Sequence, residues 1–237
     1  MQVRLGAMGG GVVVAVALAA VLGGCAESAD GGGNKAAGAS ASAKGTADGG
    51  SGAGKGAAAS GGTIGAAGSL CALPVRFAVA ERWKAKGIAA EAELSRASKG
   101  SDSDPTAALA DSLLRQGPVT AACEIDAKPA GNIGFLRVWT GKDANTDAGT
   151  VLRQFVAAED GTSKAKYRSV KTGGGLAGVE VEYLHTSKLL GETKKETALA
   201  VGTPDGPVVL HLGGMDTEEH EAMRPAYELA KQTMELT

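Results

Sequence analysis

Hydrophobic and polar residues alternate along much of the chain after residue 70, a pattern typical of strands with one buried face. In the first run, residues 73–80, large apolar side chains occupy every second position. Further runs predict strands at 118–127, 132–141, 166–175, 178–187 and 196–214, with a turn at residues 204–206 dividing the last run into two strands. The first two of these further runs are separated by a short turn segment and predict a hairpin.

Two inner segments carry apolar residues at helical spacing instead. One begins at Pro105, a favoured first residue of a helix, and stops at Gly117. The other spans residues 146–161, where Thr146 or Asp147 provides the N-terminal cap. Both segments interrupt the series of strands, so we expect helices there.

A closing helix follows Asp216, which with Glu219 forms a capping box. Pro225 lies inside the apolar pattern and predicts a kink or two short helices. Runs of adjacent strands with few helices between them are typical of an α+β fold. We therefore expect a mostly antiparallel sheet packed with helices, in one domain that spans residues 70–237.

The pattern before residue 70 is different. Residues 11–22 are apolar, but a dozen residues fall short of the roughly 20 that a membrane-spanning helix needs. With Arg4 before this run and small residues after it, residues 1–24 predict a secretory signal peptide. An ordinary secreted protein with an incidental cysteine at position 25 is the simplest alternative for this segment.

The four residues Leu22-Gly23-Gly24-Cys25 resemble a bacterial lipobox. The resemblance implies that Cys25 becomes the first residue of the mature chain and carries diacylglycerol. Two acyl chains anchor a protein stably, whereas one chain anchors it only marginally. The expected location is therefore the extracellular face of the cell membrane, with membrane lipid as a partner through Cys25.

Glycine, alanine and serine dominate residues 25–69. Such a segment buries too little apolar surface to offset the entropy of ordering, so we expect a flexible tether with a span of roughly 35–40 Å. Residues 49–56 nearly match a phosphate-binding loop. Because Gly56 stands where that loop needs Ser or Thr, we expect no nucleotide there.

Two cysteines remain in the predicted domain, Cys71 and Cys123. Disulfides persist outside the membrane, and an even pair in an exported domain predicts a disulfide. The alternative is two free buried thiols. A metal site is not expected at either cysteine, because no histidine lies near them in sequence.

The net charge and the short sequence motifs disfavour several classes of function. The formal net charge is −2 and no basic block occurs, which disfavours a nucleic-acid partner. Residues 163–166 and 171–173 match two motifs of penicillin-interacting enzymes, but they lie only a few residues apart. His220 begins a zinc-binding motif whose second histidine is replaced by Arg224, so we expect His220 to be exposed. We therefore expect no catalytic residue, no metal and no cofactor.

One predicted strand combines residues suited to binding. Phe135, Arg137 and Trp139 share one of its faces, where they could stack on a ligand and donate hydrogen bonds to it. The alternative is that a helix covers this face and Arg137 pairs with Glu180 or Glu182.

Residues 122–141, 192–201 and 206–231 resemble a family of uncharacterised lipoproteins from high-GC Gram-positive bacteria. The order of elements also resembles the PsbP-like fold. Both resemblances imply an extracytoplasmic accessory or binding domain, although a fold does not determine a function. We expect a non-catalytic interaction module that contacts an envelope protein or a wall component. The alternative is a lipoprotein that binds a small molecule or a cell-wall fragment.

Overall fold

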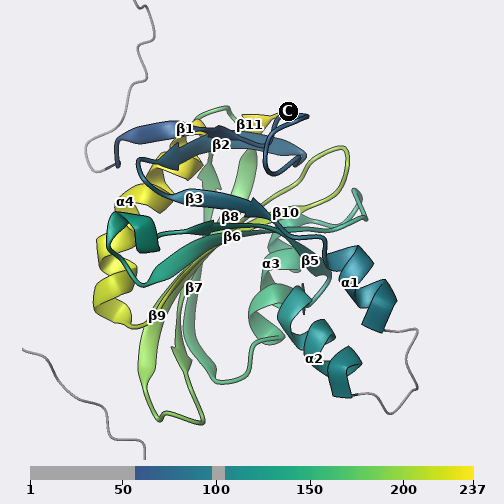
Figure 1. Ribbon diagram of the computed structural model, residues 1–237, viewed down its shortest axis with the longest axis vertical. Coiled ribbons are helices and arrows are strands. Elements are labelled where there is room, and N and C mark those ends of the chain that lie inside the picture. Colours follow the sequence, from purple (N-terminus) through teal and green to yellow (C-terminus); the bar gives the residue numbers. More distant parts are fainter. Residues whose placement is uncertain (1–56, 98–104) are drawn as a thin grey trace, which may run out of the picture. The chain divides into compact units, whose positions relative to one another are not determined.

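The computed structural model describes residues 57–97 and 105–237, so the predictions for the signal peptide, Cys25 and the first part of the tether lie outside the described residues (Figure 1). The helices are α1 (Ala90–Ala97), α2 (Pro105–Leu114), α3 (Ala148–Ala157) and α4 (Thr217–Thr233), with a 3-10 turn at Lys128–Ala130. The strands are β1 (Ser60–Ile64), β2 (Val75–Ala80), β3 (Lys84–Gly87), β4 (Arg115–Gln116), β5 (Val119–Asp126), β6 (Gly134–Thr140), β7 (Thr162–Lys171), β8 (Ala177–Thr186), β9 (Thr193–Val201), β10 (Val208–Gly214) and β11 (Glu235–Leu236).

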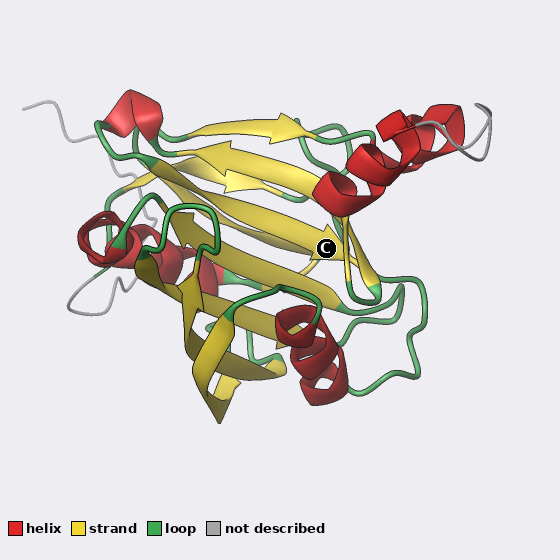
Figure 2. Cartoon of the chain, turned by 90° about the horizontal axis from the view of Figure 1, so that it is seen from below, coloured by secondary structure: helices red, strands yellow, loops and turns green. Residues whose placement is uncertain are grey.

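The strands form two sheets. The large sheet has the order β3-β5-β6-β10-β9-β8-β7, with β4 paired to β5, and the small sheet has the order β1-β2-β11. The named strands of the described residues pair antiparallel. The predicted α+β fold with a mostly antiparallel sheet is therefore confirmed, and Figure 2 shows its strands side by side with helices around them.

The large sheet buries apolar side chains on both faces, because successive residues of a strand point to opposite sides. In β10, Leu210 and Leu212 belong to the cluster that contains Tyr227 of α4. Val209, the residue before Leu210, points to the other side and belongs to the cluster that contains Phe155 of α3. We refer to these two sides of the large sheet as the α4 face and the α3 face.

The predicted domain start at residue 70 is wrong, because β1 lies inside the segment predicted as tether. β1 pairs with β2, and its last residue, Ile64, is buried in the cluster of the α4 face. Backbone hydrogen bonds to β2 and one apolar side chain stabilise this strand despite its glycines. The folded part of the chain therefore begins at least ten residues before Leu70.

The closing helix differs from its prediction at two residues. Asp216 caps it by accepting a hydrogen bond from Glu219 N at 2.8 Å, but α4 continues through Pro225 as one helix. A proline removes a single backbone donor, and the buried residues on either side of it hold both halves of α4 against the sheet. His220 is fully buried rather than exposed, because the first turns of α4 lie over β9, where Thr197 is its partner.

The predicted disulfide between Cys71 and Cys123 is present, with 5.8 Å between the two Cα atoms. It joins the segment before β2 to the centre of β5, and α1 and α2 lie in the loop that it closes. The disulfide therefore ties the small sheet to the large one. Within the described residues, the helices are too short or too polar to cross a membrane.

Candidate functional site

The three residues of the predicted binding face, Phe135, Arg137 and Trp139, lie together on the α3 face. Trp139 is buried, with its ring edge-on to Phe155 of α3 at 5.5 Å between centroids. Phe135 and Arg137 are only half-buried. Helix α3 thus covers the face at Trp139, whereas the end at Phe135 and Arg137 is partly accessible. Each of the two hypotheses from the sequence, a covered face and an accessible one, describes one end of it.

Arg137 pairs with Glu124 on the neighbouring strand β5, with Nε donating to Glu124 Oε2 at 3.0 Å. Its guanidinium also stacks over Phe135 and Trp139, at 4.5 and 5.5 Å from the ring centroids. The cation is therefore held by one carboxylate and two aromatic rings, which orient it and neutralise part of its charge.

The alternative pairing of Arg137 with Glu180 or Glu182 is wrong. These two glutamates alternate with Val179, Val181 and Tyr183 along β8 and therefore point to the α4 face. Glu180 is bound there by Arg168 and Lys231, and Glu182 by Arg224.

A group of polar side chains continues the α3 face beyond Arg137, and we call it the polar cluster; it consists of Glu159, Tyr183, His185, Lys194, Glu196 and His211. The strand register produces this continuity: His211 lies opposite Arg137, Tyr183 opposite Glu196, and His185 opposite Lys194. Glu159 enters from the loop after α3.

Glu196 lies at the centre of the polar cluster, almost completely buried. One oxygen forms a hydrogen bond with Nε2 of His211, and Lys194 Nζ lies 2.7 Å from the other oxygen. Burial alone raises the pKa of Glu196, but the attraction of His211 and Lys194 outweighs it and lowers the pKa to about 2. This carboxylate therefore stays ionised inside the protein at neutral pH.

Tyr183 lies between Glu159 and His211 in the polar cluster. Its hydroxyl donates to Glu159 Oε2 at 2.8 Å and lies 3.4 Å from His211 Nε2. Burial, together with the negative charges of Glu196 and Glu159, raises the pKa of Tyr183 well above its usual value. Tyr183 therefore acts here as a neutral hydrogen-bond donor.

The sequence did not indicate the polar cluster. The alternation along β10 places His211 on the face opposite Leu210 and Leu212, and its side chain is buried there. Glu196 and Glu159 carried no expected role, because one begins an otherwise apolar strand and the other ends a helical segment. The available signal is an acidic residue at the start of the apolar run 196–201 and a histidine inside the neighbouring apolar run. The register sets them two residues apart, since His211 lies opposite Ala198.

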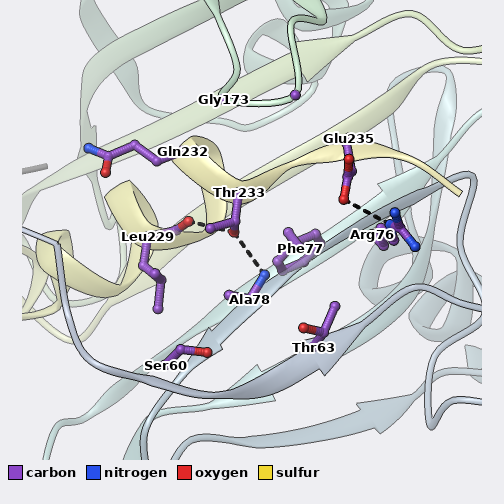
Figure 3. A pocket seen from close by; sticks show the side chains of 11 residues that line it. Ser60, Thr63, Arg76, Phe77, Ala78, Gly173, Leu229, Gln232, Thr233 and Glu235 are labelled. Carbon is purple, nitrogen blue, oxygen red and sulfur yellow. Dashed lines mark hydrogen bonds and ion pairs between the residues drawn. The ribbon is translucent and has the colours of Figure 1, made fainter. Parts of the chain in front are cut away.

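Hollows in the surface of the described domain are further candidates for binding, and two of them bear on the function. The first, about 420 Å³, continues the accessible end of the α3 face, and Phe135, Ile133 and Met215 are its large apolar residues. The second, about 370 Å³, lies between β1, β2 and the end of α4 (Figure 3). An ion pair of Arg76 with Glu235, at 2.9 Å, closes one side of this second hollow.

The model of one protein family, described as an uncharacterised lipoprotein, matches residues 40–234. The chain belongs to this family. The predicted membership of an uncharacterised lipoprotein family is thereby confirmed, while the origin in high-GC Gram-positive bacteria stays a prediction. The match covers every described element except β11, together with the polar cluster. Cys25 lies before the matched residues.

Comparisons with individual proteins give no further information on function. No curated protein matches the chain. The solution structure of the cyanobacterial PsbP protein (CyanoP) from Synechocystis sp. PCC 6803 is similar over 74% of this chain and 98% of that chain, with 10% sequence identity and a TM-score of 0.43. At this distance the likeness says nothing about a site or an activity.

Proposed function

We propose that this lipoprotein is anchored in the cell membrane through acylated Cys25 and holds its domain on the extracellular side. Membership of a lipoprotein family supports the anchor, as does the position of Cys25 directly after a short apolar run. The disulfide supports the location, because disulfides persist in oxidising compartments.

Protease treatment of intact cells tests the side of the membrane. The domain should be degraded in intact cells, while a cytoplasmic marker survives. Survival of the domain until the cells are lysed would place it inside the cell and overturn the proposed location.

We propose further that the domain is a non-catalytic interaction module whose accessible α3-face end contacts another envelope protein. The observation that carries this proposal is the exposure of two large apolar side chains, Ile133 at 51% and Met215 at 56%, beside half-buried Phe135 and Arg137. Exposed apolar residues next to an aromatic ring and an arginine are typical of protein interfaces.

Site-specific cross-linking in cells tests this interface. A photoreactive residue at position 215 should yield one cross-linked partner, and the same residue at exposed position 171 on β7 should not. Adding Arg137→Ala to the first chain should reduce that product several-fold. Equal products from both positions, or a product that ignores Arg137→Ala, would contradict the proposed interface.

The absence of catalysis is part of the same proposal. Nε2 of His211 is engaged by Glu196, and its ring packs against Phe135 and Phe155, neither of which offers a nucleophile. Purified full chain should not hydrolyse wall peptides, esters or β-lactams. Turnover that His211→Gln abolishes would show an enzyme instead.

Binding of a small molecule or cell-wall fragment is the second candidate, and the hollow in Figure 3 favours it. Its lining combines the hydroxyls of Ser60 and Thr63 with the charges of Arg76 and Glu235, which suits a polar ligand. A soluble wall fragment that binds the full chain, and binds at least tenfold more weakly after Arg76→Gln, would establish this candidate.

A further inference from the structure

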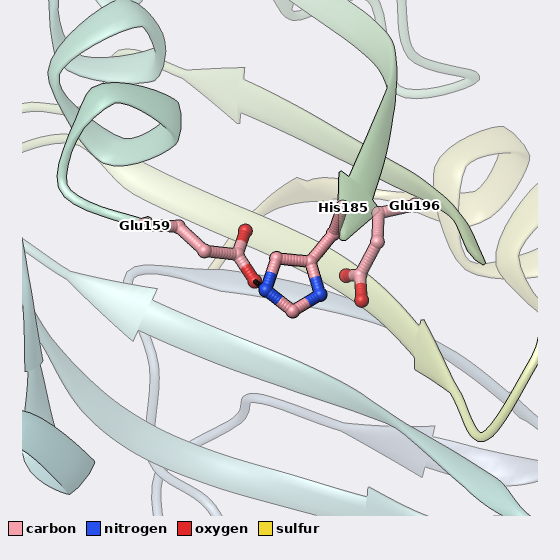
Figure 4. A group of neighbouring side chains, drawn as sticks. All are labelled: Glu159, His185 and Glu196. Carbon is pink, nitrogen blue, oxygen red and sulfur yellow. Dashed lines mark ion pairs between the residues drawn. The ribbon is translucent and has the colours of Figure 1, made fainter. Parts of the chain in front are cut away.

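Three side chains that could ligate a metal converge in the polar cluster from separate parts of the chain (Figure 4). Glu159 comes from the loop after α3, His185 from the end of β8, and Glu196 from within β9. One oxygen or nitrogen atom of each lies within 4.8 Å of the others. Figure 4 shows the imidazole between the two carboxylates, with one ring nitrogen toward each.

The imidazole of His185 is not fully hydrogen-bonded. Its Nδ1 is buried without a hydrogen-bond partner among the described residues. Its Nε2 lies 3.7 Å from Glu159 Oε1, beyond an ordinary hydrogen bond. A buried polar atom without a partner costs free energy, and a ligand that the nitrogen could bind would remove that cost.

The carboxylates retain coordination capacity despite their present contacts. Glu159 uses Oε2 to accept from Tyr183, which leaves Oε1 facing His185. Glu196 contacts His211 and Lys194, but a carboxylate has about four lone-pair positions and can accept a further partner. The site is reachable from solvent, since the side chains of His185 and Glu159 are 20% and 22% exposed.

We propose that Glu159, His185 and Glu196 bind one divalent transition-metal cation, of which Zn²⁺ is the natural probe. Imidazole and carboxylate are ordinary zinc ligands, at about 2.0–2.2 Å from the metal. The donor atoms already lie within 4.8 Å of one another, so side-chain rotation about a bound cation would complete the approach, with water as the remaining ligand. The site does not depend on the interface proposed above.

Lys194 provides an internal test of the electrostatics. Its ammonium lies 2.7 Å from Glu196 and is held by the carbonyl of Gly214 at 2.8 Å, so it competes with a metal for the same carboxylate. The substitution Lys194→Gln should strengthen metal binding, because it removes one positive charge next to the cation.

Calorimetric titration of Zn²⁺ into the chelator-treated full chain in detergent tests the site. The result expected is one equivalent bound, with affinity lowered at least tenfold by His185→Ala or Glu159→Gln, in line with the effect of losing ligand support. Asp160→Asn is the matched control, because this exposed carboxylate is the neighbour of Glu159 and lies outside the cluster. Lys194→Gln should bind more tightly than the wild type.

Melting curves recorded without and with Zn²⁺ distinguish loss of the metal site from loss of folding in a less stable variant. Zn²⁺ should raise the melting temperature of the wild type and of Asp160→Asn, but not that of folded His185→Ala. Absence of binding to the wild type would overturn the site. Binding that is unchanged in His185→Ala and Glu159→Gln would overturn it equally, because the metal would then lie elsewhere.

Discussion

His220 shows how a single buried residue makes stability depend on pH. It is fully buried in α4, with Nε2 at 2.9 Å from the hydroxyl oxygen of Thr197. Burial lowers its pKa to about 4; Arg224 and Lys195 add to the lowering, while the negative charges of Glu221 and Glu196 oppose it. The fold therefore favours the neutral imidazole.

The sign of the pH effect follows from this lowered pKa. The unfolded chain takes up a proton near pH 6.5, whereas the folded chain takes it up only near pH 4, so stability falls as the pH drops between these values. We expect a loss of about 2 kcal/mol between pH 8 and pH 5, measured by urea unfolding. His220→Gln should remove most of this loss, and a variant with the full pH dependence would contradict the assignment.

Individual residues were predictable from the sequence where a local pattern determines them. Asp147, one of the two residues expected to cap this helix, caps α3 by accepting a hydrogen bond from Thr150 N at 2.9 Å. The partner of Arg137 was not predictable, because it depends on the register of β5 against β6. That register is shifted by an irregularity at residues 121–123, which no local pattern reveals.

Among the elements, β1 is a strand that the hydrophobic pattern does not reveal. Its residues are serine, glycine, threonine and one isoleucine, so it lacks the alternation that revealed the other long strands. Its pairing with β2 forms only when both strands are in place. The strands β5, β6, β8, β9 and β10 of the large sheet were predictable because each buries apolar side chains. The polar cluster was not, because it is assembled from segments far apart in sequence.

Ile64 tests the contribution of β1 to the domain. It is buried against the cluster of the α4 face, so Ile64→Ala should destabilise the chain by about 2 kcal/mol through lost packing. Thr63→Ala, at an exposed neighbouring position, should change the stability by less than about 0.5 kcal/mol. Equal effects of the two substitutions in urea unfolding would show that β1 does not pack as described.

The disulfide tests the connection between the two sheets. Its cysteines are 52 residues apart, and loop entropy predicts that the bond contributes about 4 kcal/mol. Replacing both Cys71 and Cys123 with alanine should lower the free energy of unfolding by that order. In the denatured, unreduced wild-type chain, thiol counting should find neither cysteine free, and two reactive thiols from these positions would contradict the bond.

For the whole molecule, the proposals separate anchoring from recognition. The sequence before residue 57 carries the proposed anchor, and the described domain carries the disulfide, the accessible end of the α3 face and the polar cluster. The fold class was predictable because the pattern of strands and helices is regular. The identity of a binding partner was not predictable, because surface contacts leave no periodic pattern in a sequence.

Lipidation of Cys25 is the central claim, and metabolic labelling measures it most directly. Cells that express the full chain are grown with a palmitate analogue, and the chain is isolated and assayed for label. The wild type should carry the label, and Cys25→Ala should carry none and should either remain an unprocessed precursor or leave the membrane. Equal labelling of the two chains, or a wild type without label, would contradict the anchor.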